Sequence, residues 1–189
     1  MHGKVYKREF LEKYNITFSK DSSYLNEDVG FNRTCRIISD AIGNPIYHTK
    51  MSFMKQIKEE NSLTQKNNQE ALYKNQTRAL SLVSIHTIET CRKNNINADI
   101  ERDQIAIHLY YWFIRCAAER PEFIQEAWNG VKVFYNYFKS EIDPRNLWMG
   151  SAAIKKCLQY KNQIHFPINI LRFVNDIQQN ENMPNNYLT

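Results

Sequence analysis

The feature that most constrains the fold of this 189-residue chain is the helical spacing of its apolar residues from about residue 67 onward. These residues recur every three or four positions, which places them on one face of an α-helix. Proline or paired asparagine interrupts the pattern at several points, and both end or begin helices. The spacing predicts helices over residues 72–91, 105–118, 123–138, 152–160 and 167–177. We therefore expect a bundle-like helical domain at 67–180, followed by an asparagine-rich tail at 181–189 that frays.

The first 66 residues carry a different pattern, in which helical and strand spacing are mixed. An amphipathic helix is predicted to end near Ala41, before turn residues at 42–45. Beyond the turn, apolar and polar residues alternate over 47–53, which predicts a strand with one half-buried face. The chain is therefore expected to be α+β and mostly α, with its strand in the part at 1–66.

Two adjacent carboxylates, Glu27 and Asp28, stand where a polar loop turns into the amphipathic helix. Asn26 could cap the free backbone N–H groups there, and acidic side chains in a first turn meet the positive end of the helix dipole. Adjacent side chains on a helix point about 100° apart, so both carboxylates cannot face the same ligand. The pair is thus either ordinary helix-start chemistry or a site in which one carboxylate acts as a base. The predicted helix has an apolar stripe formed by Phe31, Cys35, Ile38 and Ile42.

The segments 3–18, GKVYKREFLEKYNITF, and 24–32, YLNEDVGFN, resemble the second half of the catalytic domain of family 2 glycosyltransferases. These enzymes use nucleotide-sugar donors and invert the anomeric carbon. Residues 62–66, SLTQK, are similar to a Ser-Ile-Thr-Arg stretch of the family. Gln65 replaces the usual arginine and Phe53 the usual tyrosine, which puts donor or acceptor contacts in doubt. The resemblance ends near residue 70.

The resemblance implies that residues 1–66 are the C-terminal part of a GT-A-like α/β catalytic domain. A nucleotide-binding half would precede them in a longer parent enzyme, because the chain enters the family motif almost at its start. We therefore expect a C-terminal fragment, or one piece of a split protein, that is inactive by itself.

The same resemblance implies roles for individual residues. Asp28 would be the general base, and Glu27 a neighbour that contacts the acceptor or the loop. Lys4 and Gly3 would lie beside the cleft for donor and acceptor, and His2 would line it. From the residues alone, Lys4 is equally well explained as a surface lysine.

The implied cofactor is a divalent metal, Mn or Mg, held mainly by an Asp-x-Asp motif in the preceding half of the parent. This chain has no such motif and is not expected to hold the metal alone. His48 is either a structural histidine or a further metal ligand of the kind some relatives have. The implied partners are a nucleotide-sugar donor and a glycan or lipid-linked acceptor, in the synthesis of surface glycan or polysaccharide.

Composition excludes several other classes. The formal net charge of +5 is spread along the chain without a block of five like charges, so we expect no nucleic-acid partner. The sequence has no run of about 18 apolar residues, so we expect no transmembrane segment. We expect a cytoplasmic protein, with peripheral attachment to the inner face of the membrane left open. Buried thiols in a reducing compartment are expected at the four cysteines Cys35, Cys91, Cys116 and Cys157.

A rival interpretation is a noncatalytic helical interaction module, whose Asn-Glu-Asp sequence is only a helix start. Aromatic runs at 110–113 and 134–138 could then bury a partner surface, including that of a second copy in a homo-oligomer. Aromatic side chains on helices usually fill a core or an interface, and stacking on a sugar ring is the less common alternative.

Overall fold

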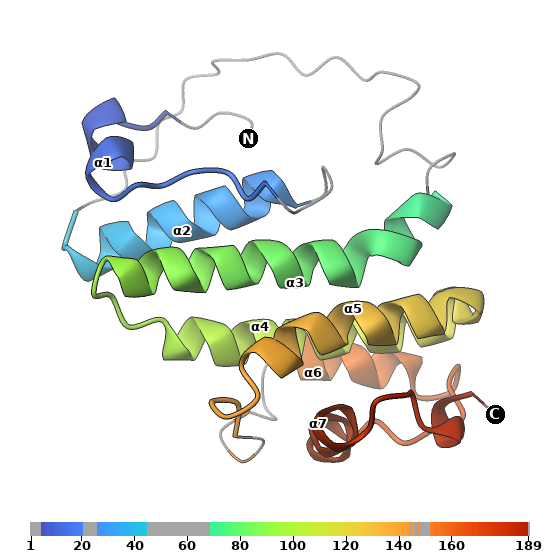
Figure 1. The fold of residues 1–189 in the computed structure, drawn as a ribbon. Coiled ribbons are helices and arrows are strands. Elements are labelled where there is room, and N and C mark those ends of the chain that lie inside the picture. Colours follow the sequence, from blue (N-terminus) through green and yellow to red (C-terminus); the bar gives the residue numbers. More distant parts are fainter. Residues whose placement is uncertain are drawn as a thin grey trace.

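The structure is a computed structural model that describes residues 5–20, 26–44, 69–143, 145, 147 and 152–188 (Figure 1). Over these ranges all regular secondary structure is helical. The α-helices are α1 (Arg8–Lys13), α2 (Glu27–Ala41), α3 (Gln69–Lys93), α4 (Asp99–Glu119), α5 (Ile124–Tyr137), α6 (Ala152–Cys157) and α7 (Ile170–Gln179). Short 3-10 turns are η2 (Pro121–Phe123), η4 (Leu158–Tyr160) and η5 (Asn185–Tyr187).

The expectation of an α+β chain that includes part of a GT-A-like α/β domain is wrong for the residues that the structure describes. In that part α2 packs on the long helix α3 and not on a sheet (Figure 1). The predicted strand at 47–53 and the motif at 62–66 lie outside the described residues. The prediction of a helix that ends near Ala41 is confirmed.

The five helices predicted in the C-terminal part are confirmed as α3, α4, α5, α6 with η4, and α7. Helices α3 and α4 extend beyond their predicted bounds. Helix α7 begins three residues after the predicted start at residue 167. Asn169 caps this helix, because its side chain accepts a hydrogen bond from the backbone N–H of Arg172. The end of the chain differs from expectation. Met183 and Tyr187 are buried, and the Tyr187 hydroxyl donates to Asp176 at 2.9 Å, so the expectation that this tail frays is wrong up to residue 188.

Helix α3 lies between α2 on one side and α5 on the other (Figure 1). On the α2 side, a Cβ added at Gly30 would lie 3.0 Å from the Cβ of Val83. The Thr34 hydroxyl donates to the Thr87 hydroxyl at 3.0 Å and to the Gly30 carbonyl at 3.0 Å. Because both helices present small side chains at this contact, their backbones can approach closely.

The contact between α3 and α5 is closer still. A Cβ added at Gly130 would lie 2.2 Å from Thr77 Oγ1 and 2.5 Å from the backbone nitrogen of Arg78. The Ser81 hydroxyl donates to the Gly130 carbonyl at 2.8 Å. Ser81 of α3 therefore satisfies its hydroxyl inside the helix interface. The hydroxyls of Thr77 and Ser84, on the same helix, are buried with no hydrogen-bond partner among the described residues.

An aromatic core fills the space between α4, α5 and α7. Trp128 is fully buried, and its ring centroid lies 5.7 Å from those of both Phe173 and Tyr187. Phe113 of α4 lies against the same rings, 4.9 Å from Phe173. Such a cluster removes a large apolar area from water, which favours the packing of these helices.

The segment around α1 is fastened to α2 and α3 by side chains. His86 Nε2 lies 3.1 Å from the Thr17 carbonyl, and Asn94 Nδ2 donates to the Tyr14 carbonyl at 2.9 Å. Ile16 is buried between these contacts. The described N-terminal residues thus form a layer over the outer face of α2 and α3 (Figure 1).

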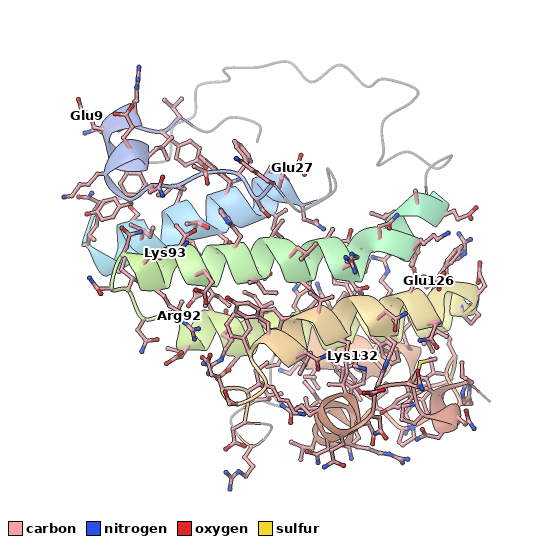
Figure 2. The ribbon with its side chains drawn as sticks, in the orientation of Figure 1. Glu9, Glu27, Arg92, Lys93, Glu126 and Lys132 are labelled. Atoms are coloured by element: carbon pink, nitrogen blue, oxygen red, sulfur yellow. The ribbon has the colours of Figure 1, made fainter. Side chains whose placement is uncertain are left out.

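At the far end of α3, charged side chains join the helix ends. Arg102 is only 7% exposed and pairs with Glu141 at 3.0 Å and Asp99 at 2.8 Å. Arg92, at the end of α3 in Figure 2, pairs with Glu141 as well. Glu141, which pairs with both arginines, therefore joins α3 and α4 to the chain that follows α5. Of the helices that the structure describes, none is long and apolar enough to cross a membrane.

Candidate site at the N-terminus of α2

The two predicted site carboxylates, Glu27 and Asp28, lie in the first turn of α2. Both side chains are half-buried, and Glu27 marks this end of the helix above α3 in Figure 2. His2, Gly3 and Lys4 fall outside the described residues.

Asn26 precedes the carboxylates in the left-handed conformation, with φ 60° and ψ 10°. A side-chain N-cap has extended backbone angles, and Asn26 makes no capping hydrogen bond. Its Oδ1 instead accepts from the buried Gln76 of α3 at 3.4 Å, while its Nδ2 is buried with no acceptor among the described residues. The interpretation of Asn26 as the side-chain cap of α2 is therefore wrong. The residue fixes the start of the helix against α3.

The backbone beside the carboxylates is held by a hydrogen-bonded chain of side chains. Asn32, one turn after Asp28, donates from Nδ2 to the Asp28 carbonyl at 2.6 Å. The Tyr6 hydroxyl donates to Asn32 Oδ1, and burial, with a smaller effect of Cys35, raises the pKa of Tyr6 to about 12. Tyr6 therefore stays a neutral donor at physiological pH, and the segment before α1 is connected to the first turn of α2.

Two aromatic rings support this connection. Tyr6 meets Phe31 edge-on, with ring centroids 5.2 Å apart. Phe18 stacks on Phe31, with ring centroids 4.4 Å apart. Sequence reasoning did not identify Tyr6 or Asn32 as parts of the site. The spacing of four between Asp28 and Asn32 was the available signal, because residues four apart share a helix face.

The first turn of α2 is therefore a rigid platform for two carboxylates. Gly30 and Thr34 hold the helix close to α3, as described above, and a site built on a packed helix keeps its geometry better than one on a loop. The helix dipole stabilises negative charge in this turn. A half-buried carboxylate here can accept a hydrogen bond from a ligand hydroxyl and take its proton.

No group of three or more metal-ligating side chains occurs among the described residues, around Glu27 and Asp28 or elsewhere in them. His48, the weaker metal-ligand candidate, is among the residues that the structure does not describe.

Most of the aromatic candidates for sugar stacking are core residues. Tyr110, Phe113, Phe134, Tyr135 and Phe138 are at most 1% exposed. This leaves little of their surface for a sugar ring, and the predicted core role of these rings is confirmed. By contrast, Tyr137 is 53% exposed, while Tyr111 and Trp112 are half-buried on α4.

The four cysteines are buried, as predicted. Burial raises the pKa of Cys91 to about 11 and is the largest cause that raises those of Cys116 and Cys157 to about 12. These thiols therefore stay protonated at neutral pH and are poor nucleophiles.

Comparisons with protein-family models, with curated proteins and with solved structures find no match to this chain. Its function is therefore inferred from the first turn of α2 and from the family resemblance of residues 3–18 and 24–32.

Proposed function

We propose that this chain is part of an inverting glycosyltransferase and contributes the acceptor side of its active site, with Asp28 as the general base. The observation that carries the proposal is the position of Asp28 in a fixed first turn of α2, inside the segment that resembles the family. The part of the chain that the structure describes would contribute to this reaction from helices and not from an α/β layer.

In the proposed reaction an acceptor hydroxyl attacks the anomeric carbon of a nucleotide-diphosphate sugar. The new glycosidic C–O bond forms as the bond from that carbon to the diphosphate oxygen breaks, and the configuration inverts. The Asp28 carboxylate takes the hydroxyl proton as its oxygen becomes the nucleophile. A divalent Mn or Mg ion, held mainly outside this chain, would neutralise charge on the leaving diphosphate.

Two features of the site favour this role over simple helix-start chemistry. Asn26, which would have been the cap, accepts a hydrogen bond from Gln76 instead, and its buried amide nitrogen has no acceptor in the part of the chain that the structure describes. The Tyr6 and Asn32 side chains fix the backbone of Asp28, which is the precision that general-base catalysis requires. Glu27 points away from Asp28 by about 100° and is left to contact the acceptor or the neighbouring loop.

The test is the Asp28→Asn variant in the complete coding sequence, assayed for sugar transfer and for donor hydrolysis with manganese present. We expect transfer to fall by about 10²- to 10⁴-fold, the usual contribution of a general base, with an unchanged melting temperature. Asp40→Asn is the matched control, because Asp40 is an exposed acid near the other end of α2. Preserved transfer together with lower stability in Asp28→Asn would contradict the proposal.

A second experiment tests whether the proposed reaction needs more chain than these 189 residues. Donor binding and hydrolysis are compared between the 189-residue chain and a version extended upstream through the complete coding sequence. We expect activity in the longer version alone.

One observation favours a second candidate, the noncatalytic interaction module. Val5, Phe18 and Val29 are 80%, 41% and 42% exposed, and Phe18 stacks on Phe31 close to the two carboxylates. Exposed apolar side chains such as Phe18 and Val29, near the start of α2, are candidates for a protein interface. Inactivity of both versions in the preceding experiment would favour this candidate over the glycosyltransferase.

A further inference from the structure

Although no five like charges are adjacent, the net positive charge of this chain comes from one part of its sequence. Residues 144–175 contain no aspartate or glutamate, and their five basic residues are Arg145, Lys155, Lys156, Lys161 and Arg172. The whole chain has 25 basic and 20 acidic residues, which leaves 20 of each outside this segment. The segment therefore carries the whole formal net charge of +5. A local excess of one sign attracts partners of the opposite sign.

Helix α6 (Ala152–Cys157) and the turn η4 (Leu158–Tyr160) bring three of these basic residues to one surface. Helix α6 packs on α4, and its buried residues are Ile154 and Cys157, three positions apart. The side chains on its outer side and just after it are exposed, namely Lys155, Lys156, Leu158, Gln159, Lys161 and Asn162. We call these six residues the α6 surface. It combines three lysines with one exposed leucine and contains no carboxylate.

A carboxylate of α4 does lie beside this surface, but its charge is matched. The hydroxyl of Tyr160, at the end of η4, donates to Glu119 at 2.7 Å. Glu119 also pairs with Nε of Arg115 at 2.9 Å. Because this arginine balances it, Glu119 adds no net negative charge beside the three lysines. The positive potential of the α6 surface is therefore retained.

We infer that the α6 surface is a docking site for a membrane surface that contains anionic phospholipid. Lysines near such a surface are attracted by the negative charge of its headgroups. Leu158 is 55% exposed, and it lies three residues from both Lys155 and Lys161. An apolar side chain among lysines is typical of segments that lie in the membrane interface, because it enters the boundary between headgroups and acyl chains. The aliphatic stems of the lysines can follow it while their charges stay among the headgroups.

The chemistry of the α6 surface favours a membrane over a nucleic acid, the other large anion that lysines attract. Proteins that bind single strands add aromatic side chains on which bases stack. The six residues of the α6 surface include no aromatic residue. An exposed leucine among the lysines gains nothing from a phosphate backbone, whereas it loses contact with water in a lipid interface.

The α6 surface is separate from the proposed active site. Helix α6 packs on α4, whereas the first turn with Glu27 and Asp28 belongs to α2, which packs on α3. The inference therefore does not depend on the proposed glycosyltransferase activity.

The test is co-sedimentation of the full 189-residue chain with phosphatidylcholine vesicles, with and without phosphatidylglycerol. We expect binding that requires phosphatidylglycerol and weakens as sodium chloride is raised, because salt screens exposed charges. Replacing Lys155, Lys156 and Lys161 together by glutamine should weaken binding about 100-fold, since each lysine near an anionic surface contributes about fivefold. Leu158→Gln should weaken it by several fold at unchanged charge.

The matched control removes the same charge from another side of the molecule. Lys7, Lys13 and Lys20 are exposed residues in and around α1, and α3 lies between α1 and α6 in Figure 1. Replacing these three by glutamine gives the same net charge as the α6 variant, and we expect it to bind vesicles as the unchanged chain does. The single variants Lys155→Gln and Lys161→Gln, each expected to weaken binding about fivefold, decide the matter if the triple variant does not fold.

A last arm measures binding of a mixed-sequence single-stranded RNA by fluorescence anisotropy. Binding of the RNA without binding of phosphatidylglycerol vesicles would overturn the inference and assign the lysines to a nucleic acid. Equal loss of vesicle binding in the two triple variants would also overturn it, because net charge alone would then explain the attraction. Vesicle binding that does not depend on phosphatidylglycerol, or no vesicle binding at low salt, would have the same meaning.

Discussion

Asn26 illustrates what a single residue contributes at the start of α2. A side-chain cap was one of the two interpretations that the sequence allowed there, because asparagine before a helix usually is one. The structure places it at φ 60° with its side chain toward Gln76, a conformation that depends on a neighbour fifty positions away in the sequence. Glu27 and Asp28 were predictable at a helix start, whereas the conformation before them was not.

Two variants of Asn26 distinguish a side-chain cap from a residue in the left-handed conformation, because the two roles predict opposite orders of stability. In a side-chain cap, serine matches asparagine and exceeds glycine. In the left-handed conformation glycine is favoured and serine is strained by about 1–2 kcal/mol. We therefore expect Asn26→Gly to unfold close to the unchanged chain and Asn26→Ser to lose about 1 kcal/mol, measured by urea denaturation. The reverse order of stability would contradict the left-handed conformation and support a side-chain cap at Asn26.

Arg33 shows the same limit for a charged residue. It lies off the apolar stripe of α2, which predicts a solvated side chain. In the structure it is half-buried, one turn before Arg36, which pairs with Glu101 of α4 at 3.4 Å. Periodicity identifies the apolar face of a helix, but it does not reveal which polar side chains a second helix covers.

At the scale of the elements, the helices were predictable from local spacing and their packing was not. The stripe of α2 at Phe31, Cys35 and Ile38 is buried as predicted, whereas Ile42, its fourth predicted member, lies just past the end of the helix and is 37% exposed. Such a stripe fits a sheet or a helix equally well, and the family resemblance favoured a sheet. The small side chains at Gly30 and Thr34, which fit against α3, decide the outcome among the described residues.

The contact between α3 and α5 gives a prediction for Gly130. A methyl group there would lie 2.5 Å from a backbone nitrogen of α3, so the helices must move apart. We expect Gly130→Ala to lose about 1–3 kcal/mol of unfolding free energy despite the higher helix propensity of alanine. Gly30→Ala is the comparison, since its nearest contact is a side chain at 3.0 Å, and it should lose less. Thermal unfolding of both variants provides the measurement. Equal or smaller loss at Gly130 would contradict this packing.

At the scale of the whole molecule, the end of the chain completes the core. Composition predicted a frayed tail, because asparagine-rich ends rarely pack. Tyr187 nevertheless fills a space between Trp128 and Phe166, with ring centroids 5.7 Å and 4.8 Å away. A single aromatic residue, placed by the turns before it, outweighs the polar composition around it.

Removal of the Tyr187 side chain should therefore destabilise the whole fold. We expect Tyr187→Ala to lose about 3–5 kcal/mol, the usual cost of deleting a buried aromatic ring, and to increase amide hydrogen exchange in α5 and α7. Leu188→Ala is the matched control, because Leu188 is 54% exposed and its truncation should change stability by less than about 0.5 kcal/mol. Similar stability of the two variants would mean that the tail is not part of the core in solution.

The four buried cysteines have a practical consequence for following this fold in motion. Cys35, Cys91, Cys116 and Cys157 lie on four different helices, α2, α3, α4 and α6. A thiol reagent can modify each sulfur only when its own helix opens to solvent. The order in which the four thiols become labelled, followed by mass spectrometry, would therefore record the order of local openings without an introduced reporter group.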